Sequence, residues 1–429
     1  MKVGVSSVNI TPPIGVPMAG YAARKGPSIG IHDDLYAKAI VFDDGETKAA
    51  LIRCDLLWLE KDFIEKTRRL IESEIGIAGR NILITCTHTH SGPITDPLFP
   101  ELEAWMDVLS RKIKGAVFAA NRELRDAKIG FGKGSLEGIV INRRRLEGPV
   151  DTEVNVIRID DLSGNPMAAL INYTCHAVVL GSDNLFISAD YPGYVMRFVE
   201  KNLGIPALFV NGACGDINPL DKLARLRLER KENIYNRCGG TFGEAERLGS
   251  MIGAEAVRIL LETETIDDLE LKVLSREVKI PLEDLPTMHE LKKKLEENEE
   301  IFRKSLREKN VARAYAASMT IRSARNLIRC IEGGEEARHT EIQAFRIGDD
   351  GIVGLPGEIF VEIGLNIKKK SDFSHTIVCE LSNDAIGYVP TREAFMEQGY
   401  EVGVARNLHY TDEVGCIIES EALKTLEMI

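Results

Sequence analysis

The sequence lacks the features that mark membrane, secreted and disulfide-stabilised proteins. Its eight cysteines are scattered singly without any C-x-x-C pair, and most lie in apolar runs, which is typical of buried thiols in a reducing compartment. No apolar run approaches the roughly 20 residues that span a bilayer. The first residues show no basic segment followed by an apolar one, so no signal peptide is visible. These absences predict a cytoplasmic protein without a transmembrane segment.

Basic stripes, catalytic serine signatures and linkers are also missing. The formal net charge is -12 and the sequence pI about 5.4, which argues against nucleic-acid binding, because that binding depends on Lys and Arg facing phosphates. The single G-x-S-x-G match, Gly26-Pro27-Ser28-Ile29-Gly30, lacks the apolar strand before it and the helical pattern after it that define the catalytic signature, which disfavours a nucleophilic serine hydrolase. No internal repeat and no segment rich in Pro, Gly or Ser marks a boundary, so we expect one domain over residues 1–429.

What the chain does contain is material for a large core. Hydrophobic residues make up 44% of its 429 residues, which is ordinary for a globular protein. Short apolar strands alternate with stretches of helical periodicity, and this pattern predicts an α/β fold in which mixed β-sheets are layered with helices.

One segment departs from this pattern. Residues 287–331 are highly charged, nearly free of Gly and Pro, and predict a helical hairpin that breaks near Glu308-Lys309-Asn310. The simplest interpretation is a solvated arm packed on the domain. A contact between subunits of an oligomer, or a lid, is the alternative.

Several of the apolar strands end at a polar residue that can carry chemistry. His88, His176, the loop at Gly215-Asp216 and Glu358 each follow such a strand, and functional sites gather at strand ends in sheet-based folds. His88 and His90 form an H-x-H pair, and on an extended strand residues two apart face the same side.

Such imidazoles can bind zinc. Taken singly, however, each of these residues also has a structural interpretation. The H-x-H pair can be a hydrogen-bonded loop, His176 a buried core histidine, Glu358 a carboxylate near a helix N-terminus, and Tyr388 a half-buried aromatic.

A resemblance to a known family joins these residues. The segment Thr87-His88-Thr89-His90-Ser91-Gly92-Pro93 resembles the T-H-T-H-S-G-P motif of the neutral/alkaline (non-lysosomal) ceramidases. Further segments that resemble this family follow in the same order: Gly30-Ile31-His32-Asp33, Ile141-Asn142-Arg143, Asn172-Tyr173-Thr174-Cys175-His176, Gly215-Asp216-Ile217-Asn218-Pro219, Pro356-Gly357-Glu358, Ser382-Asn383 through Tyr388, Thr391-Arg392-Glu393 and Gln398-Gly399-Tyr400-Glu401. The resemblance spans nearly the whole chain and implies the fold of the family's catalytic domain alone.

The resemblance also implies roles for individual residues. The family's zinc ligands correspond to His88, His176, Glu358 and Tyr388. Its catalytic-site residues correspond to His90, Arg143 and Tyr400, and its substrate-handling loop to Asp216 and Asn218. The implied chemistry is hydrolysis of an amide by a zinc-activated water, with His90 moving a proton to the leaving nitrogen and zinc, Tyr or Arg stabilising the oxyanion.

The sequence departs from the family in the loop that handles the ceramide head group. Asn218 stands where the family has Ser, and Ala213 and Leu220 replace two family Asn residues. The sequence therefore predicts a zinc-dependent hydrolase that cleaves the amide bond of a small or lipid-like N-acyl substrate other than ceramide. The alternatives are a true neutral ceramidase of lipid metabolism and a zinc-containing binding protein without catalysis. An esterase or phosphoesterase is a weaker enzyme alternative, since zinc-bound hydroxide also attacks those centres.

Overall fold

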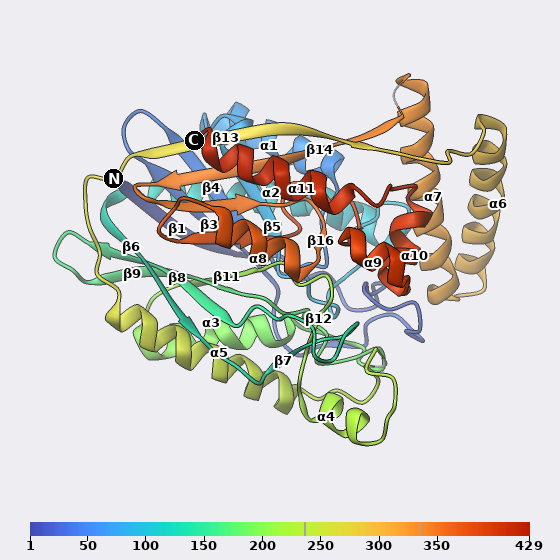
Figure 1. Cartoon of the computed structure of the whole chain (residues 1–429), viewed down its shortest axis with the longest axis horizontal. Coiled ribbons are helices and arrows are strands. Elements are labelled where there is room, and N and C mark those ends of the chain that lie inside the picture. The colour runs from blue at the N-terminus through green and yellow to red at the C-terminus, as the bar shows by residue number, and fades with distance from the viewer. Residues whose placement is uncertain (236, 335) are drawn as a thin grey trace.

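Two β-sheets pack face to face and helices cover both outer surfaces (Figure 1). The computed structural model describes residues 1–235, 237–334 and 336–429. Alternate residues of the long strands face opposite sides, as strand geometry requires: in β3 (Tyr36–Asp43), Ala37, Ala39 and Val41 pack toward the helices, whereas Ile40 and Phe42 pack toward the second sheet. The predicted α/β fold of mixed sheets layered with helices is confirmed.

The larger sheet has eight strands and the smaller sheet four. The order in the larger sheet is β11 (Ala207–Asn211), β9 (Pro166–Tyr173), β8 (Glu153–Asp161), β6 (Arg125–Ser135), β1 (Lys2–Asn9), β3, β4 (Lys48–Cys54) and β5 (Ile82–Cys86). The order in the smaller sheet is β13 (Leu271–Pro281), β14 (Ala337–Ile347), β15 (Asp350–Gly354) and β17 (Thr376–Cys379). Three short pairs complete the strands: β10 (Phe186–Ile187) with β2 (Gly30–Ile31), β12 (Ile217–Pro219) with β7 (Val140–Asn142), and β16 (Glu358–Ile359) with β18 (Tyr388–Val389).

Helices fill the two outer layers and one end of the molecule. The larger sheet carries α1 (Lys61–Ile75), α2 (Pro100–Arg122), α3 (Asp190–Leu203) and α5 (Phe242–Glu262), and the smaller sheet carries α8 (Val361–Lys370) and α11 (Val414–Glu427). The remaining helices are α4 (Lys222–Glu229), α6 (Met288–Arg307), α7 (Val311–Glu332), α9 (Arg392–Glu397), α10 (Tyr400–Asn407) and a 3-10 turn at Gly79–Asn81. Within the described residues, no helix combines the length and apolar character needed to cross a membrane.

The larger sheet curls so strongly that its two edges come back into contact. β5 and β11 stand at opposite ends of the strand order, yet they touch each other. The segment after β17 closes the gap between them: the side chain of Asn383 accepts a hydrogen bond from the backbone N–H of Ile84 on β5 (2.9 Å), and the N–H of Glu380 donates to the carbonyl of Asn211 on β11 (3.1 Å). His88 follows β5, and His176 follows β9, the neighbour of β11, so the closure of the sheet brings these two predicted ligands near each other.

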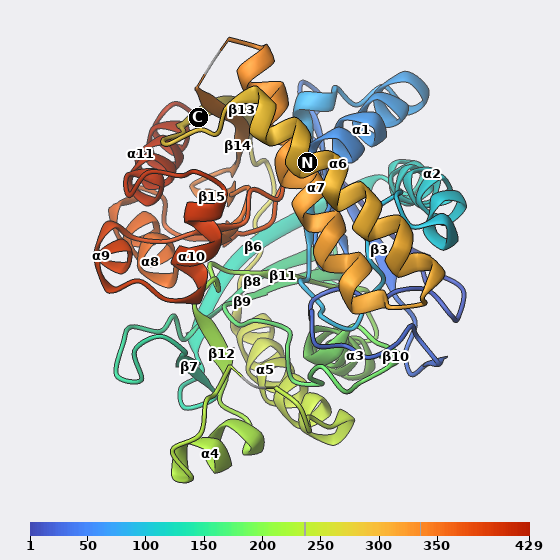
Figure 2. The same ribbon diagram turned by 90° about the vertical axis from the view of Figure 1, so that its right-hand side faces the viewer.

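The α6–α7 arm, residues 288–332, stands at one end of the sheets (Figures 1 and 2). Its first helix begins with a capping box, in which Thr287 and Glu290 each satisfy the other's backbone N–H. The two helices are joined at Glu308, Lys309 and Asn310, and the side chain of Asn310 caps α7 by accepting from the N–H of Arg313 (3.0 Å). The arm is thus a pair of antiparallel helices with local start and stop signals.

Candidate active site

Four of the predicted residues converge where the strands of both sheets end. His88 follows β5, His176 follows β9, and Glu358 and Tyr388 begin β16 and β18. The last two strands run parallel with Glu358 beside Tyr388, so their side chains share one face. His88 and His176 are fully buried, and the carboxylate of Glu358 lies between them.

All three imidazoles of the site present the same unprotonated nitrogen to its centre. Each Nδ1 atom lies within hydrogen-bond distance of a backbone carbonyl: His88 with Leu57 (3.0 Å), His176 with Cys214 (2.5 Å) and His90 with Gly20 (3.1 Å). A carbonyl only accepts, so each neutral imidazole carries its proton on Nδ1 and leaves a lone pair on Nε2. With their protons on Nδ1, the three imidazoles and the Glu358 carboxylate form a set of acceptors that a metal ion, or a proton on one Nε2 atom, would satisfy.

The spacing of these atoms fits a tetrahedral zinc ion. The Oε2 atom of Glu358 lies 3.4 Å from Nε2 of His88 and 3.3 Å from Nε2 of His176. Donors about 2.0–2.1 Å from a tetrahedral zinc are about 3.3–3.4 Å from one another. Nε2 of His90 is 3.3 Å from Nε2 of His88, and the ligand atoms of the three histidines lie within 4.8 Å of one another. The residues present therefore fit a metal ion, and the geometry admits His90 as a further donor.

His88 and His90 face each other for a different reason from the expected one. The segment after β5 is a turn and not a strand, and His88 adopts a left-handed conformation with φ of 60°. His90 packs so closely on Gly20 (φ of 94°) that a Cβ there would lie 2.5 Å from Nδ1 of the imidazole. Strained backbone of this kind clusters at functional sites, and here it turns both rings toward one point.

Burial and charge set the protonation of these groups in opposite directions. Burial would raise the pKa of Glu358, but the adjacent His176 and His88 rings hold it well below its usual range. Burial and the nearby charge of Arg143 lower the pKa of His176 to about 4, and burial with the neighbouring imidazoles lowers that of His90 well below its usual value. Burial alone would lower the pKa of His88 as well, but the Glu358 carboxylate produces a net rise. Neutral His176 and His90 and an ionised Glu358 are the forms that bind metal or accept a proton.

Arg143 links the phenol of Tyr388 to the rest of the protein. Its Nη2 atom donates to the hydroxyl of Tyr388 (3.1 Å) and to the carbonyl of Gly215 (2.8 Å), and its Nε donates to the buried carboxylate of Glu401 (2.8 Å). Burial raises the pKa of Tyr388 well above its usual value, and the charge of Glu358 adds to this. In these surroundings Tyr388 is a protonated phenol with a fixed orientation.

The two residues assigned to substrate handling lie behind this network. The Oδ1 of Asn218 accepts from Nη1 of Arg143 (3.2 Å). The carboxylate of Asp216 accepts from the N–H of Val361 (2.9 Å) and from the side chain of Asn142 (2.7 Å), and burial raises its pKa to about 6. Both side chains are 2% exposed, and neither is among the described residues that line the cavity. The change from Ser to Asn at position 218 therefore alters the support of Arg143 and not the cavity wall.

The site opens into a cavity of about 460 Å³. The predicted residues that line it are His88, His90, Glu358, Tyr388 and Tyr400, whereas His176 and Arg143 stand behind them. Tyr400 is 62% exposed, and its ring centroid lies 5.8 Å from that of Tyr388. Apolar side chains form much of the remaining wall, among them Leu57, Trp58, Met319, Leu381, Val404 and Leu408.

Glu380 is a buried carboxylate at this site that the sequence analysis did not single out. It accepts hydrogen bonds from the backbone N–H groups of Cys214 (3.0 Å) and Ile359 (3.2 Å) and from the Cys214 thiol (2.8 Å). One side chain thereby joins the loop that fixes His176 to the strand that carries Glu358. Its position in the sequence could have identified it: Glu380 directly follows the buried strand β17, much as His88 comes two residues after the buried strand β5.

Comparison with known proteins identifies the relatives of this chain. A family model described as neutral/alkaline non-lysosomal ceramidase, N-terminal, matches residues 1–213. Neutral ceramidase from Mycobacterium tuberculosis (strain ATCC 25618 / H37Rv) is 24% identical over 461 residues, covering 90% of this chain and 70% of the relative. Neutral ceramidase B of Dictyostelium discoideum is 27% identical over 48% of this chain, and the match spans about a third (33%) of that relative's length.

The fold has a counterpart among solved structures. The crystal structure of neutral ceramidase from Pseudomonas aeruginosa matches with a TM-score of 0.74 and 19% identity, covering 99% of this chain and 74% of that chain. The resemblance inferred from the motifs is thereby confirmed.

Proposed function

We propose that this relative of the neutral/alkaline ceramidases is a metal-dependent hydrolase that cleaves the N-acyl amide bond of a ceramide-like lipid. The observation that carries the proposal is the convergence of three imidazole lone pairs and the Glu358 carboxylate on one wall of an open cavity. A set of neutral and anionic donors with an open side is the arrangement of a catalytic zinc site.

The substrate inferred from the sequence requires revision. The replacement of the family Ser by Asn218 argued against ceramide, but that side chain is engaged by Arg143 and does not line the cavity. The relatives are named neutral ceramidases, and the wall of the cavity around Trp58 and Met319 is apolar. These observations favour the ceramidase alternative over an N-acyl substrate other than ceramide.

His88, His176 and Glu358 would hold the metal, and Tyr388, the fourth ligand that the family resemblance implies, would be one that the metal can lose. A zinc ion in this position supplies a Lewis acid and lowers the pKa of a water molecule, so that a nucleophile is available at neutral pH. The protein contributes the orientation of its ligands: the carbonyls of Leu57 and Cys214 fix the two rings, and such partners tune metal ligands.

His90 would move the proton of the reaction. Its Nδ1 is engaged by the Gly20 carbonyl, and its Nε2 faces the cavity beside His88. Because burial keeps the ring neutral, His90 can accept the proton of the attacking water and donate it to the amide nitrogen as the carbon–nitrogen bond breaks. The products are a carboxylate and an amine.

Arg143 and Tyr388 would stabilise the negative oxygen that develops on the carbonyl. Tyr388 lines the cavity, and Arg143 donates to its hydroxyl from behind. The Glu401 carboxylate holds Arg143 in place, so this donor is oriented before substrate arrives. Preorganised donors of this kind are a large term in catalysis.

Hydrolysis of a long-chain ceramide by the purified protein tests the proposal. We expect the zinc-loaded protein to release fatty acid and sphingoid base, a chelator to stop the release, and added zinc to restore it. Tyr388→Phe and His90→Ala should retain zinc and lose most activity. A zinc-loaded protein that cleaves no N-acyl amide would contradict the proposal.

A further inference from the structure

One face of α7 lies along the cavity. Tyr315, Met319, Arg322 and Asn326 all line it, and their spacing of four, three and four residues places them on one side of the helix. Tyr315 and Arg322 are about 10 Å apart along the axis, at 1.5 Å per residue. In Figure 2 the arm stands beside the ends of the strands that carry the site.

The end of this face near Tyr315 adjoins the reacting groups. Tyr315 interacts with the backbone of Gly20, whose carbonyl lies 3.1 Å from Nδ1 of His90. From there the wall carries apolar side chains on both sides, with Met319 and Ala316 on α7 and with Trp58, Leu381, Val404 and Leu408 on the body of the protein, and the polar residues Thr320, Ser323 and Lys294 also line it. A hydrocarbon chain that starts at the scissile amide therefore finds apolar surface on both sides.

The part of the cavity between α7 and the body of the protein forms a groove. Its end away from Tyr315 is closed by ion pairs. Arg322 pairs with Glu60 (2.9 Å) and stacks over Trp58, and Arg338 pairs with Asp384 (3.3 Å).

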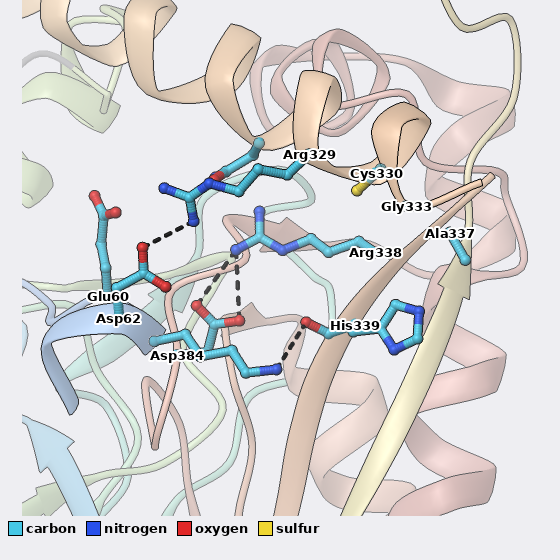
Figure 3. A pocket seen from close by; sticks show the side chains of 11 residues that line it. Glu60, Asp62, Arg329, Cys330, Gly333, Ala337, Arg338, His339 and Asp384 are labelled. Atoms are coloured by element: carbon cyan, nitrogen blue, oxygen red, sulfur yellow. Dashed lines mark hydrogen bonds and ion pairs between the residues drawn. The ribbon is translucent and has the colours of Figure 1, made fainter. Parts of the chain in front are cut away.

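A second pocket of about 400 Å³ begins at this point, because Asn326 and Arg338 line both cavities. Figure 3 shows that the second pocket is charged, with the Arg338–Asp384 pair and an Arg329–Asp62 pair (2.8 Å) facing one another. A hydrocarbon entering it would remove these charges from water without replacing their hydration, which is costly.

We propose that the groove under α7 measures the length of one hydrocarbon chain of the substrate, with Met319 and Ala316 on its wall setting how many methylenes it holds and the Arg322–Glu60 and Arg338–Asp384 pairs setting where it ends. The proposal rests on the hydrolase function above and specifies its substrate as a lipid amide with a chain of limited length. The arm that the sequence marks only as charged helices is then the part of the molecule that selects among lipids.

Chain length should affect binding in two phases. Each added methylene buried in the groove tightens binding by up to about fourfold. Beyond the length at which the chain reaches the ion pairs, further methylenes should add nothing or weaken binding. Met319→Ala should move this break to longer chains, and Ala316→Leu, at an exposed position on the cavity wall, should move it to shorter ones.

Displacement of a fluorescent fatty acid by saturated fatty acids of stepped length measures the break without requiring catalysis. The full-length zinc-loaded protein is titrated with each acid, and kcat/KM is measured in parallel for N-acyl sphingosines of the same acyl lengths. Two control variants carry the same substitutions away from the cavity: Met428→Ala at an exposed site near the C-terminus, and Ala254→Leu on the exposed face of α5. Both controls should reproduce the wild-type break.

The outcomes separate this inference from the proposed function. A break that shifts in opposite directions in Met319→Ala and Ala316→Leu supports the groove, even if no amide is hydrolysed. Affinity that rises steadily with chain length in the wild type, or a break that both variants leave in place, overturns it even when ceramide is cleaved. Circular dichroism confirms that each variant is folded, and a folded variant with an unmoved break counts against the proposal.

Discussion

The two ends of the cavity are built in different ways. The metal end consists of buried strand ends, and each imidazole is fixed by a backbone carbonyl. The α6–α7 arm consists of two charged helices that pack on the core through buried side chains such as Phe302 and Ile321. Its outer contacts include exposed ion pairs, such as Arg329 with Asp62, which are 60% and 69% exposed. Arg322 is intermediate between these two kinds of contact, because it is only partly exposed, pairs with Glu60 and packs on Trp58.

This difference in construction matches a difference in role: the metal end carries the reacting groups, and the arm forms the wall that selects the substrate. Reacting groups need positions fixed within fractions of an ångström, which buried strand ends provide. A wall that selects substrates needs only shape and polarity, so a peripheral helical arm suffices. Changes at the metal end should therefore abolish activity or metal binding, whereas changes in the arm should alter the preferred substrate or have little effect.

The largest expected effect follows removal of a metal ligand. His176→Ala removes one of the lone pairs that face Glu358, so bound zinc should fall to background. Activity should fall about a thousandfold or more, because the metal contributes several kcal/mol of transition-state stabilisation. Elemental analysis and a hydrolysis assay measure the two effects. His289→Ala, at an exposed position on α6, is the matched control and should retain both properties.

Loss of the phenol at the cavity wall should reduce turnover while leaving the metal in place. Tyr388→Phe removes the hydroxyl that accepts from Arg143, and loss of one oxyanion donor costs about a hundredfold to a thousandfold in kcat. Steady-state kinetics should show a reduced kcat with little change in KM. Tyr36→Phe, outside the cavity lining, serves as the control. A tenfold rise in KM with an unchanged kcat would assign Tyr388 to ground-state binding instead.

A buried carboxylate near the metal end should make stability depend on pH. Burial raises the pKa of Asp190 from 3.8 to about 6. The protonated form is favoured in the folded protein, so this contribution to stability is fully present below about pH 4 and is lost as the pH rises through about 6. The loss amounts to about 3 kcal/mol.

The stability difference between Asp190→Asn and the wild type should therefore change by about this amount between pH 4 and pH 7, in favour of the variant. Urea unfolding at several pH values measures it, with the exposed Asp349→Asn as the control. A difference that does not depend on pH would contradict the assignment.

The hydrogen bonds that Glu380 accepts should affect metal affinity less than the loss of a metal ligand does. Glu380→Gln keeps the shape of the side chain but places an amide where the carboxylate accepts from Cys214 and Ile359. Loss of such a supporting contact costs about tenfold to a hundredfold in metal affinity. Competition with a zinc chelator gives the affinity, and Glu296→Gln on the exposed face of α6 is the control. Unchanged affinity combined with reduced stability would give Glu380 a purely structural role.

The smallest effect is expected at the periphery of the arm. Arg329→Ala breaks the exposed pair with Asp62, and pairs of this kind contribute less than about 1 kcal/mol to stability. Urea unfolding should therefore show nearly the wild-type midpoint. A loss of several kcal/mol would mean that ion pairs hold the arm and would weaken the contrast between the two ends.

Local patterns in the sequence predicted the layered fold and marked His88, His176 and Glu358 as polar residues after apolar strands. Only the resemblance to the ceramidase family joined them into one predicted metal site, because each residue alone also has a structural interpretation. His88 and His90 do not face each other through strand alternation, as the sequence predicts, because the segment leaves the strand and His88 adopts a left-handed conformation. Turn conformation at a histidine carries almost no signal in the sequence.

Features that depend on contacts distant in the sequence could not be predicted. Glu380 acts through backbone groups at positions 214 and 359, and the buried position of Asn218 follows from Arg143. The sequence predicted that the arm is helical. It did not predict that the arm lies along the cavity, because that depends on how α7 packs on the rest of the protein. A single sequence does not show which residues distant along the chain come into contact.

The most direct test of the metal centre is a crystal structure of the zinc-loaded protein with anomalous diffraction data at the zinc absorption edge. The account predicts one anomalous peak, about 2.0–2.2 Å from Nε2 of His88, Nε2 of His176 and a carboxylate oxygen of Glu358. No peak at this position after zinc loading, or a peak bound elsewhere on the chain, would contradict it.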